Sequence, residues 1–254
     1  MQEAVHFKNR QGETLAGTLH LPEPPGPEGV ILGHCFTCSR HTSILRETAR
    51  KLTERGITAL RFDFSGNGQS EGDFINTAYT RHIQEMTQAR NFLSGRGITR
   101  FGLAGHSMGA AIAILAGSRM ERIEGICAFS GRLGGLDPEG TFSPAQLATL
   151  RETGEVAFQS RGRRLVLPQA FFEDAARYDI LETIASLTPP LLIVHGDRDE
   201  IIPVSNARAA KARNDRATLE IIPGADHMYG DAPLRDRVAA LAADWFRHCF
   251  DARH

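Results

Sequence analysis

Short, mostly apolar runs alternate with helix-length segments through most of this 254-residue chain. The runs that have the length of a buried strand are residues 30–32, 58–62, 101–104, 125–129, 191–194 and 219–222. Strands that are apolar on both faces are typical of a parallel sheet covered by helices. The pattern therefore predicts an α/β protein with a mostly parallel central sheet flanked by helices.

The first part of the chain has a different period. Apolar and polar residues alternate over residues 5–7 and 15–21, with a turn at Gln11-Gly12 between them, which predicts an antiparallel pair of strands. Segments with apolar residues at helical spacing predict helices at 44–55, 79–93 and 233–250. Ser43 is the expected N-cap of the first of these helices, and Gly56 is its expected end.

Residues 132–179 interrupt the alternation. They predict a helix at 144–152, a hairpin at 155–167 that turns at 160–162, and a helix at 169–178. An insertion of this kind after a sheet strand predicts a cap over the carboxyl ends of the strands, where α/β proteins bind ligands. Its aromatic residues are candidates for substrate binding, namely Phe142, Phe158, Phe171 and Phe172. A surface excursion without a binding role is the alternative.

The amino-acid composition is that of a globular protein and does not indicate a particular function. Hydrophobic residues make up 41% and charged residues 23%, which is typical of a globular protein, and the length suits a single domain, 1–254. A net charge of -1 gives no reason to expect nucleic acid or an anionic membrane as a partner. Residues 1–21 lack a signal-peptide pattern, and no run approaches the roughly 20 apolar residues of a membrane helix.

The four cysteines are too few and too scattered to predict a disulfide framework. We therefore expect a cytoplasmic protein. Cys35 and Cys38 have the C-x-x-C spacing of redox motifs, but without a second such motif or a thioredoxin-like context. Packing within a loop is the favoured interpretation, and a redox switch, in which oxidation distorts this loop, is the alternative. No pattern predicts a metal or a cofactor.

A catalytic motif lies at Gly105-His106-Ser107-Met108-Gly109, directly after the apolar run 101–104 and before a small-residue helix start. A G-x-S-x-G sequence between a buried strand and a helix is the context of a nucleophile elbow, in which the serine occupies a strained turn. The helix N-terminus adds free N–H groups that favour negative charge. We predict that Ser107 is a nucleophile, with a structural serine in a tight turn as the alternative.

A serine nucleophile needs a base that is itself oriented by an acid, and in this type of fold the acid precedes the histidine in the chain. The histidines after Ser107 are His195, His227, His248 and His254. His227 is the favoured base because it lies in a loop after a sheet strand. His195 ends a buried strand and is expected to be structural, whereas the last two lie in or beyond the final helix.

Three carboxylates follow the strand at 191–194. Asp199 is the favoured acid because it lies past the tightest part of the turn, and Asp197 is the second choice. The oxyanion hole needs two backbone N–H groups. Met108, which follows the nucleophile, supplies one, and Phe36, in the loop after the strand at 30–32, is the candidate for the other.

These residues together resemble those of single-domain α/β-hydrolase esterases, and the chain looks most similar to the feruloyl or cinnamoyl esterases of gut bacteria. The resemblance extends over nearly the whole length and rests on HCFT at 34–37, TSILRE at 42–47, RFDFSGNGQS at 61–70, GHSMG at 105–109, GDRDEIIP at 196–203 and GADH at 224–227. It implies an α/β-hydrolase fold with a cap insertion, the triad Ser107, Asp199 and His227, and oxyanion donors at Phe36 and Met108. In that family the position of Asp63 ties loops together.

The chain departs from the family in the first oxyanion loop. Cys35 and Cys38 stand where the family usually has a glycine and a small residue. If the family glycine has a positive φ, a side chain at residue 35 costs about 1–2 kcal/mol.

The resemblance and the residues together predict hydrolysis of carboxylic esters through an acyl-enzyme, with short or medium acyl groups or hydroxycinnamoyl groups as substrates. A thioesterase or an aminopeptidase-like hydrolase is the alternative within catalysis, and a non-catalytic small-molecule receptor is the alternative outside it. The expected partner is a small-molecule ester rather than nucleic acid or membrane, and whether the chain forms a homodimer stays open.

Overall fold

A computed structural model describes residues 1–136 and 138–252 of the protein. Within these residues one sheet has the strand order β1-β2-β4-β3-β5-β6-β9-β10, and β7 pairs with β8 in a separate two-stranded sheet. The strands are β1 (Gln2–Lys8), β2 (Thr14–His20), β3 (Glu28–Gly33), β4 (Thr58–Phe62), β5 (Arg100–His106), β6 (Ile123–Phe129), β7 (Glu155–Ser160), β8 (Arg163–Pro168), β9 (Leu191–Gly196) and β10 (Thr218–Ile222).

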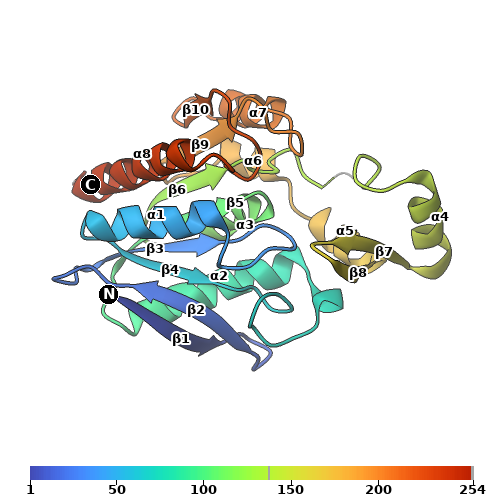
Figure 1. The fold of residues 1–254 in the computed structure, drawn as a ribbon, viewed down its shortest axis with the longest axis horizontal. Coiled ribbons are helices and arrows are strands. Elements are labelled where there is room, and N and C mark those ends of the chain that lie inside the picture. The colour runs from blue at the N-terminus through green and yellow to red at the C-terminus, as the bar shows by residue number, and fades with distance from the viewer. Residues whose placement is uncertain (137, 253–254) are drawn as a thin grey trace.

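Helices cover both faces of the large sheet (Figure 1). They are α1 (Ser43–Glu54), α2 (Tyr79–Ser94), α3 (Met108–Gly117), α4 (Pro144–Thr153), α5 (Gln169–Ala175), α6 (Ile180–Ala185), α7 (Ser205–Arg213) and α8 (Ala232–Asp251), with a short 3₁₀ helix at Phe74–Asn76. The helices α1 and α8 pack together on one face, and α2 and α3 pack together on the other. None of the helices in the described ranges is long and apolar enough to cross a membrane.

The sheet is mostly parallel, as the apolar runs predict. The strand β2 is antiparallel to both of its neighbours, β1 and β4, whereas the pairs from β4 through β3, β5, β6, β9 and β10 are parallel. The interior strands β4 and β9 are buried at every residue because helices cover both of their faces. The predicted α/β architecture and the antiparallel lead-in are confirmed.

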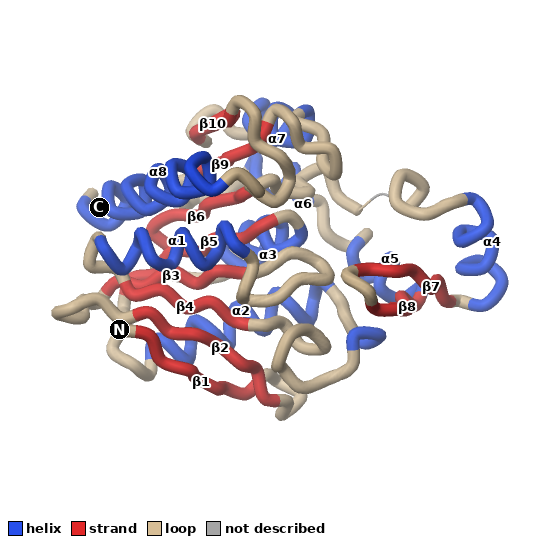
Figure 2. Tube along the Cα trace, viewed as in Figure 1, coloured by secondary structure: helices blue, strands red, loops and turns tan. Residues whose placement is uncertain are grey.

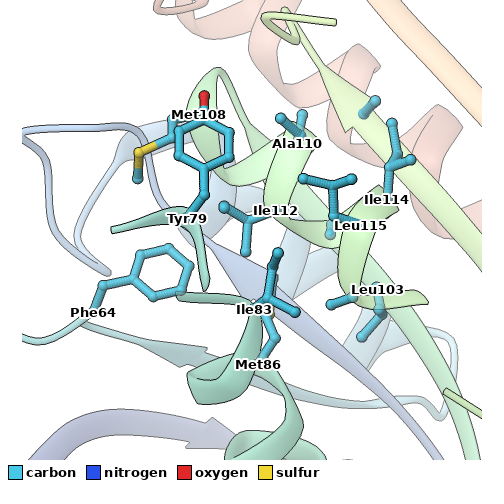
Figure 3. Close-up of a cluster of buried hydrophobic side chains, with 14 of the residues drawn as sticks. Phe64, Tyr79, Ile83, Met86, Leu103, Met108, Ala110, Ile112, Ile114 and Leu115 are labelled. Carbon is cyan, nitrogen blue, oxygen red and sulfur yellow. The ribbon is translucent and has the colours of Figure 1, made fainter. Parts of the chain in front are cut away.

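The helices α2 and α3 pack against each other and cover one face of the sheet. Figure 3 shows Ile83 and Met86 of α2 in the same cluster as Ile112 and Leu115 of α3. Every residue of α3 is buried, so this helix has no polar face and is held by packing on all sides. The helix that carries the elbow is therefore fixed in the core.

The start of the first helix corrects one expectation. Thr42 is the N-cap of α1, and Ser43 is the first helical residue. The Thr42 hydroxyl donates to the carbonyl of Ser39 at 2.9 Å, so no side chain caps the helix. Arg55 is the C-cap, and Gly56, with φ of +76°, ends the helix as predicted.

The insertion after β6 folds as predicted into α4, the β7–β8 hairpin and α5, and these elements lie to one side of the large sheet (Figure 2). The hairpin turn reaches the loop after β3, where the hydroxyl oxygens of Thr37 and Ser160 are 2.7 Å apart. The expected ranges 132–179 and 1–254 include Asp137 and residues 253–254, which lie outside the described residues.

A buried carboxylate holds the loop after β3 in place. Asp63, which is fully buried at the end of β4, accepts hydrogen bonds from the backbone N–H of Arg40 at 2.6 Å and of Gln69 at 2.9 Å. It also forms an ion pair with the Arg40 guanidinium. Asp63 therefore ties two loops together, which agrees with the role that the resemblance implies.

We predict that Asp63→Asn lowers the free energy of unfolding by about 3–5 kcal/mol, because it leaves the buried Arg40 charge without its partner. Urea denaturation followed by circular dichroism measures the change. The control is Asp244→Asn, which breaks a surface ion pair with Arg55 and should cost less than about 1 kcal/mol. Equal losses in the two variants would contradict the prediction.

Candidate active site

Ser107 lies between β5 and α3 in a strained backbone conformation, with φ of 57° and ψ of -116°. Its own N–H donates to the carbonyl of Phe129 at the end of β6, at 2.9 Å. The flanking glycines allow the sharp turn, because a Cβ on Gly105 would lie 2.0 Å from the carbonyl oxygen of Gly109. The serine side chain is thereby placed at the carboxyl end of the parallel strands.

A cavity of about 420 Å³ opens beside this turn. Ser107 and His227 both line it, and each is 8% exposed. His227 follows β10 in a loop, and its Nδ1 lies 2.8 Å from Oδ2 of Asp199, which follows β9. Three residues that are distant in the sequence thus meet at one edge of the sheet.

The environment of Asp199 keeps this carboxylate ionised. Burial acts to raise its pKa, but hydrogen bonds from His195, from His227 and from the backbone N–H of Ile202 outweigh burial and hold the pKa well below its usual range. The side chain of Asp197 lies elsewhere and accepts from the backbone N–H of Gly224 at 2.7 Å. Asp199 is therefore the carboxylate that contacts His227.

The hydrogen bond to Asp199 fixes the form of the His227 ring. A carboxylate only accepts hydrogen bonds, so Nδ1 carries the proton and Nε2 of the neutral ring is free to act as a base. The structure has no hydrogen bond between this ring and the Ser107 hydroxyl among the described residues. In hydrolases without substrate this contact is often long and tightens on binding.

Two further histidines support the site rather than line it. His195 donates Nε2–H to the carbonyl of Ile202 at 2.8 Å, and the same nitrogen lies 3.3 Å from Oδ2 of Asp199. His195 therefore has a structural role that includes contact with Asp199. His106 is not part of the described cavity lining, and it donates Nε2–H to the carbonyl of His227 at 2.7 Å. His248 is exposed on α8, and His254 lies outside the described residues.

Both candidate oxyanion donors are available. Phe36 and Met108 line the cavity, and neither backbone N–H donates a hydrogen bond to a described residue. Phe36 is held in a β-turn that is closed by a hydrogen bond of 3.1 Å from the N–H of Cys38 to the carbonyl of Cys35. Met108 supplies the first free N–H of α3.

The same turn corrects the expectation for the two cysteines. Cys35 and Cys38 form a disulfide that closes the turn around Phe36, so packing alone does not describe them. The redox switch stays a prediction. Cys35 is not among the described residues with positive φ, so the left-handed strain considered for a side chain at this position does not arise.

The insertion contributes part of the apolar wall of the cavity. Phe142, Phe171 and Phe172 line it. Phe158 lies behind this wall and stacks on Phe36, with ring centroids 6.0 Å apart and planes 11° apart. Three of the four aromatic candidates thus face the cavity directly, and the fourth positions an oxyanion-loop residue.

Sequence reasoning missed the polar residues of the cavity wall. Tyr79 at the start of α2, Arg132 shortly after β6 and Arg161 in the hairpin turn all line the cavity. Arg132 could have been found from its place just beyond the carboxyl end of a parallel strand. The other two had no local signal, because only the tertiary fold brings α2 and the hairpin to this cavity.

Comparisons with known proteins agree with this architecture. A model described as the Alpha/beta hydrolase family matches residues 30–244. A Mycobacterium tuberculosis protein named as a candidate phosphoribosyl transferase is 26% identical over 252 residues, which cover 94% of this chain and 46% of that protein. This chain therefore spans about half the length of that relative.

Two further relatives match along most of their length. The monoacylglycerol lipase of Mycolicibacterium smegmatis is 24% identical over 254 residues, covering 86% of this chain and 88% of that protein. The structure of Est1E from Butyrivibrio proteoclasticus with bound ferulic acid has a TM-score of 0.85 at 22% identity, covering 98% of this chain and 100% of the other. At this level of identity the structural likeness shows the fold alone.

Three buried histidines are neutral, and two of them, His34 and His106, hold loops around the site. His34 donates Nδ1–H to the carbonyl of Cys35 at 2.7 Å and accepts from the N–H of Phe64 at 3.0 Å, which only the neutral ring can do. Burial lowers the pKa of His34 to about 4, that of His106 to about 3 and that of His20 to about 4. Protonation of these rings is therefore unfavourable in the folded protein.

We predict that the free energy of unfolding is largest above about pH 6.5 and decreases as the pH falls toward 5. The unfolded chain binds a proton at each of these histidines below its ordinary pKa near 6.5, whereas the folded protein does not. Each fully neutral histidine then contributes up to about 1.4 kcal/mol per pH unit. Urea denaturation between pH 7.5 and pH 5 measures the slope, and a stability that is constant over this range would contradict the prediction.

Proposed function

Because this chain belongs to the Alpha/beta hydrolase family, we propose that it is a serine hydrolase that cleaves carboxylic esters through an acyl-enzyme on Ser107. One observation carries the proposal. The strained elbow presents Ser107 to the cavity that His227 also lines, and His227 is bonded to Asp199 at 2.8 Å. A nucleophile, a base and an orienting acid are the groups that acyl transfer requires.

The reaction proceeds in two halves. His227 Nε2 takes the hydroxyl proton as the Ser107 oxygen attacks the ester carbonyl, and the backbone N–H groups of Phe36 and Met108 bind the oxyanion. His227 then returns the proton to the alcohol as the C–O bond breaks. Water repeats these steps on the acyl-enzyme and releases the acid. The ionised Asp199 stabilises the imidazolium and holds Nδ1–H in place throughout.

The shape of the cavity supports small esters with an apolar or aromatic part. Its volume of about 420 Å³ and its phenylalanine wall suit a short or medium acyl group or a hydroxycinnamoyl group. The likeness to a structure with bound ferulic acid and to a monoacylglycerol lipase supports ester hydrolysis as well. Thioester or anilide hydrolysis and pure ligand binding are the other outcomes of the test.

We predict that the protein turns over p-nitrophenyl esters in multiple cycles and that Ser107→Ala lowers kcat by at least about 10⁴-fold. Rates are compared at equal concentration for p-nitrophenyl esters of increasing acyl length, methyl ferulate, an acyl-CoA and an aminoacyl anilide. A preference for the anilide or the acyl-CoA would replace the ester assignment. Absence of turnover on every substrate would leave a binding role.

We predict that Phe36→Pro lowers kcat about 10²- to 10³-fold relative to Phe36→Ala, because proline removes the N–H that binds the oxyanion. Phe36 is the second residue of the β-turn that starts at Cys35, a position where proline is well tolerated. Both variants lose the aromatic ring, so their comparison isolates the N–H. Equal kcat values in two variants with matching circular dichroism would exclude Phe36 as a donor.

A further inference from the structure

The cavity carries positive charge that no carboxylate in its described lining balances. Arg132 and Arg161 line it, and none of the described lining residues is Asp, Glu or Lys. The one carboxylate of the catalytic group, Asp199, is bonded to two histidines behind the cavity wall. A neutral apolar ester does not need this arrangement.

The two arginines differ in their contacts with the described residues: Arg161 has a weak acceptor, and the Arg132 side chain has no partner. The backbone N–H of Arg132 donates to the carbonyl of Ser107 at 3.4 Å, which places this residue next to the nucleophile. Its half-buried guanidinium has no hydrogen bond or ion pair with any residue in the described ranges. Arg161 donates to Sγ of Cys38 at 3.2 Å, and a sulfur atom is a weak acceptor.

A second polar group of the wall also has no partner among the described residues. Tyr79 lines the cavity and is 1% exposed, and its hydroxyl is buried without a hydrogen bond to any described residue. Figure 3 shows this hydroxyl at the end of the ring that lies toward Met108, another residue of the lining. Burial raises the pKa of Tyr79 to about 12, with the charge of Arg132 acting in the opposite direction, so the hydroxyl stays a hydrogen-bond donor at neutral pH.

We propose that Arg132 and Tyr79 form a carboxylate-binding subsite, and that the natural substrate is an ester with a free carboxylate away from the bond that is cleaved. A guanidinium presents a planar set of donors that matches a carboxylate, and a buried phenol adds a further donor. The ligand would satisfy both groups at once. The substrate class rests on the proposed function, whereas the subsite itself does not.

Binding to the Ser107→Ala variant tests the subsite without catalysis. The first pair of probes is methyl 4-carboxycinnamate and methyl 4-carbamoylcinnamate, which differ in charge but hardly in shape. The second pair is monomethyl adipate and its monoamide, whose flexible chains place the same groups differently. We expect isothermal titration calorimetry to give an affinity about 10- to 100-fold higher for the acid than for the amide in at least one pair.

Variants assign this preference to the subsite. Arg132→Met in the Ser107→Ala background should abolish the preference for the acid, while Arg132→Lys should retain part of it. Arg164→Met is the matched control, because Arg164 is exposed on β8 and outside the cavity lining. It removes the same charge from the same part of the molecule and should leave the preference unchanged.

The Tyr79→Phe variant tests whether the Tyr79 hydroxyl binds the carboxylate of the ligand or has only a structural role. It should weaken binding of the acid several-fold and leave binding of the amide unchanged. It should not lower the melting temperature, because the hydroxyl has no partner to lose.

Two results would overturn the subsite: equal affinities for acid and amide in both pairs, or a preference that survives in Arg132→Met. If the proposed ester hydrolysis is wrong but the subsite exists, the experiments would give a different result. In that case the unsubstituted protein would not turn over any ester, while the preference for the acid in binding would remain.

Discussion

Close approach of backbone to backbone at the elbow is the constraint on which the rest of the site depends. A Cβ on Gly109 would lie 2.3 Å from the carbonyl oxygen of Gly33, and one on Gly105 would lie 2.0 Å from that of Gly109. The start of α3 is therefore in direct contact with the end of β3. This contact holds Ser107 in its strained conformation and brings the loop with Phe36 beside the N-terminus of α3. Phe36, Ser107 and Met108 therefore line a single cavity.

A strained turn persists only where its surroundings determine it, and here the surroundings are buried polar groups with specific partners. His34 links the loop after β3 to the loop after β4 through Cys35 and Phe64. Asp63 links the same loop to Gln69. His106 holds the loop that carries His227. The residues proposed for chemistry thus rest on a layer of neutral histidines and one buried carboxylate, and that layer gives the site its sensitivity to acid.

Local patterns in the sequence predicted the strands and the elbow, because each has a signal within a few residues. They could not predict features that depend on a single backbone angle or on contacts between residues distant in the sequence. Thr42 and Ser43 are both good N-cap residues, and only the backbone angles show which one begins α1. The contacts of Asp199 with His227 and of Asp197 with Gly224, which favour Asp199 as the acid, could not be read from the sequence. The helices α6 and α7 have only six and nine residues, which is too short for a clear helical period in the sequence.

The polar groups at the sheet edge have hydrogen-bond partners, whereas some of those in the cavity wall have none among the described residues. At the sheet edge, Asp199 accepts hydrogen bonds from His227 and from the backbone N–H groups of Ile201 and Ile202, and buried hydrogen bonds hold the neighbouring loops. In the cavity wall, the Tyr79 hydroxyl is buried without a partner among the described residues, which costs about 1–3 kcal/mol. A phenylalanine there would avoid that cost, and a neutral residue in place of Arg132 would remove an unbalanced charge. A ligand that hydrogen-bonds to both groups would remove this cost, which is why we propose that the cavity wall selects the substrate while the groups at the sheet edge carry out the reaction.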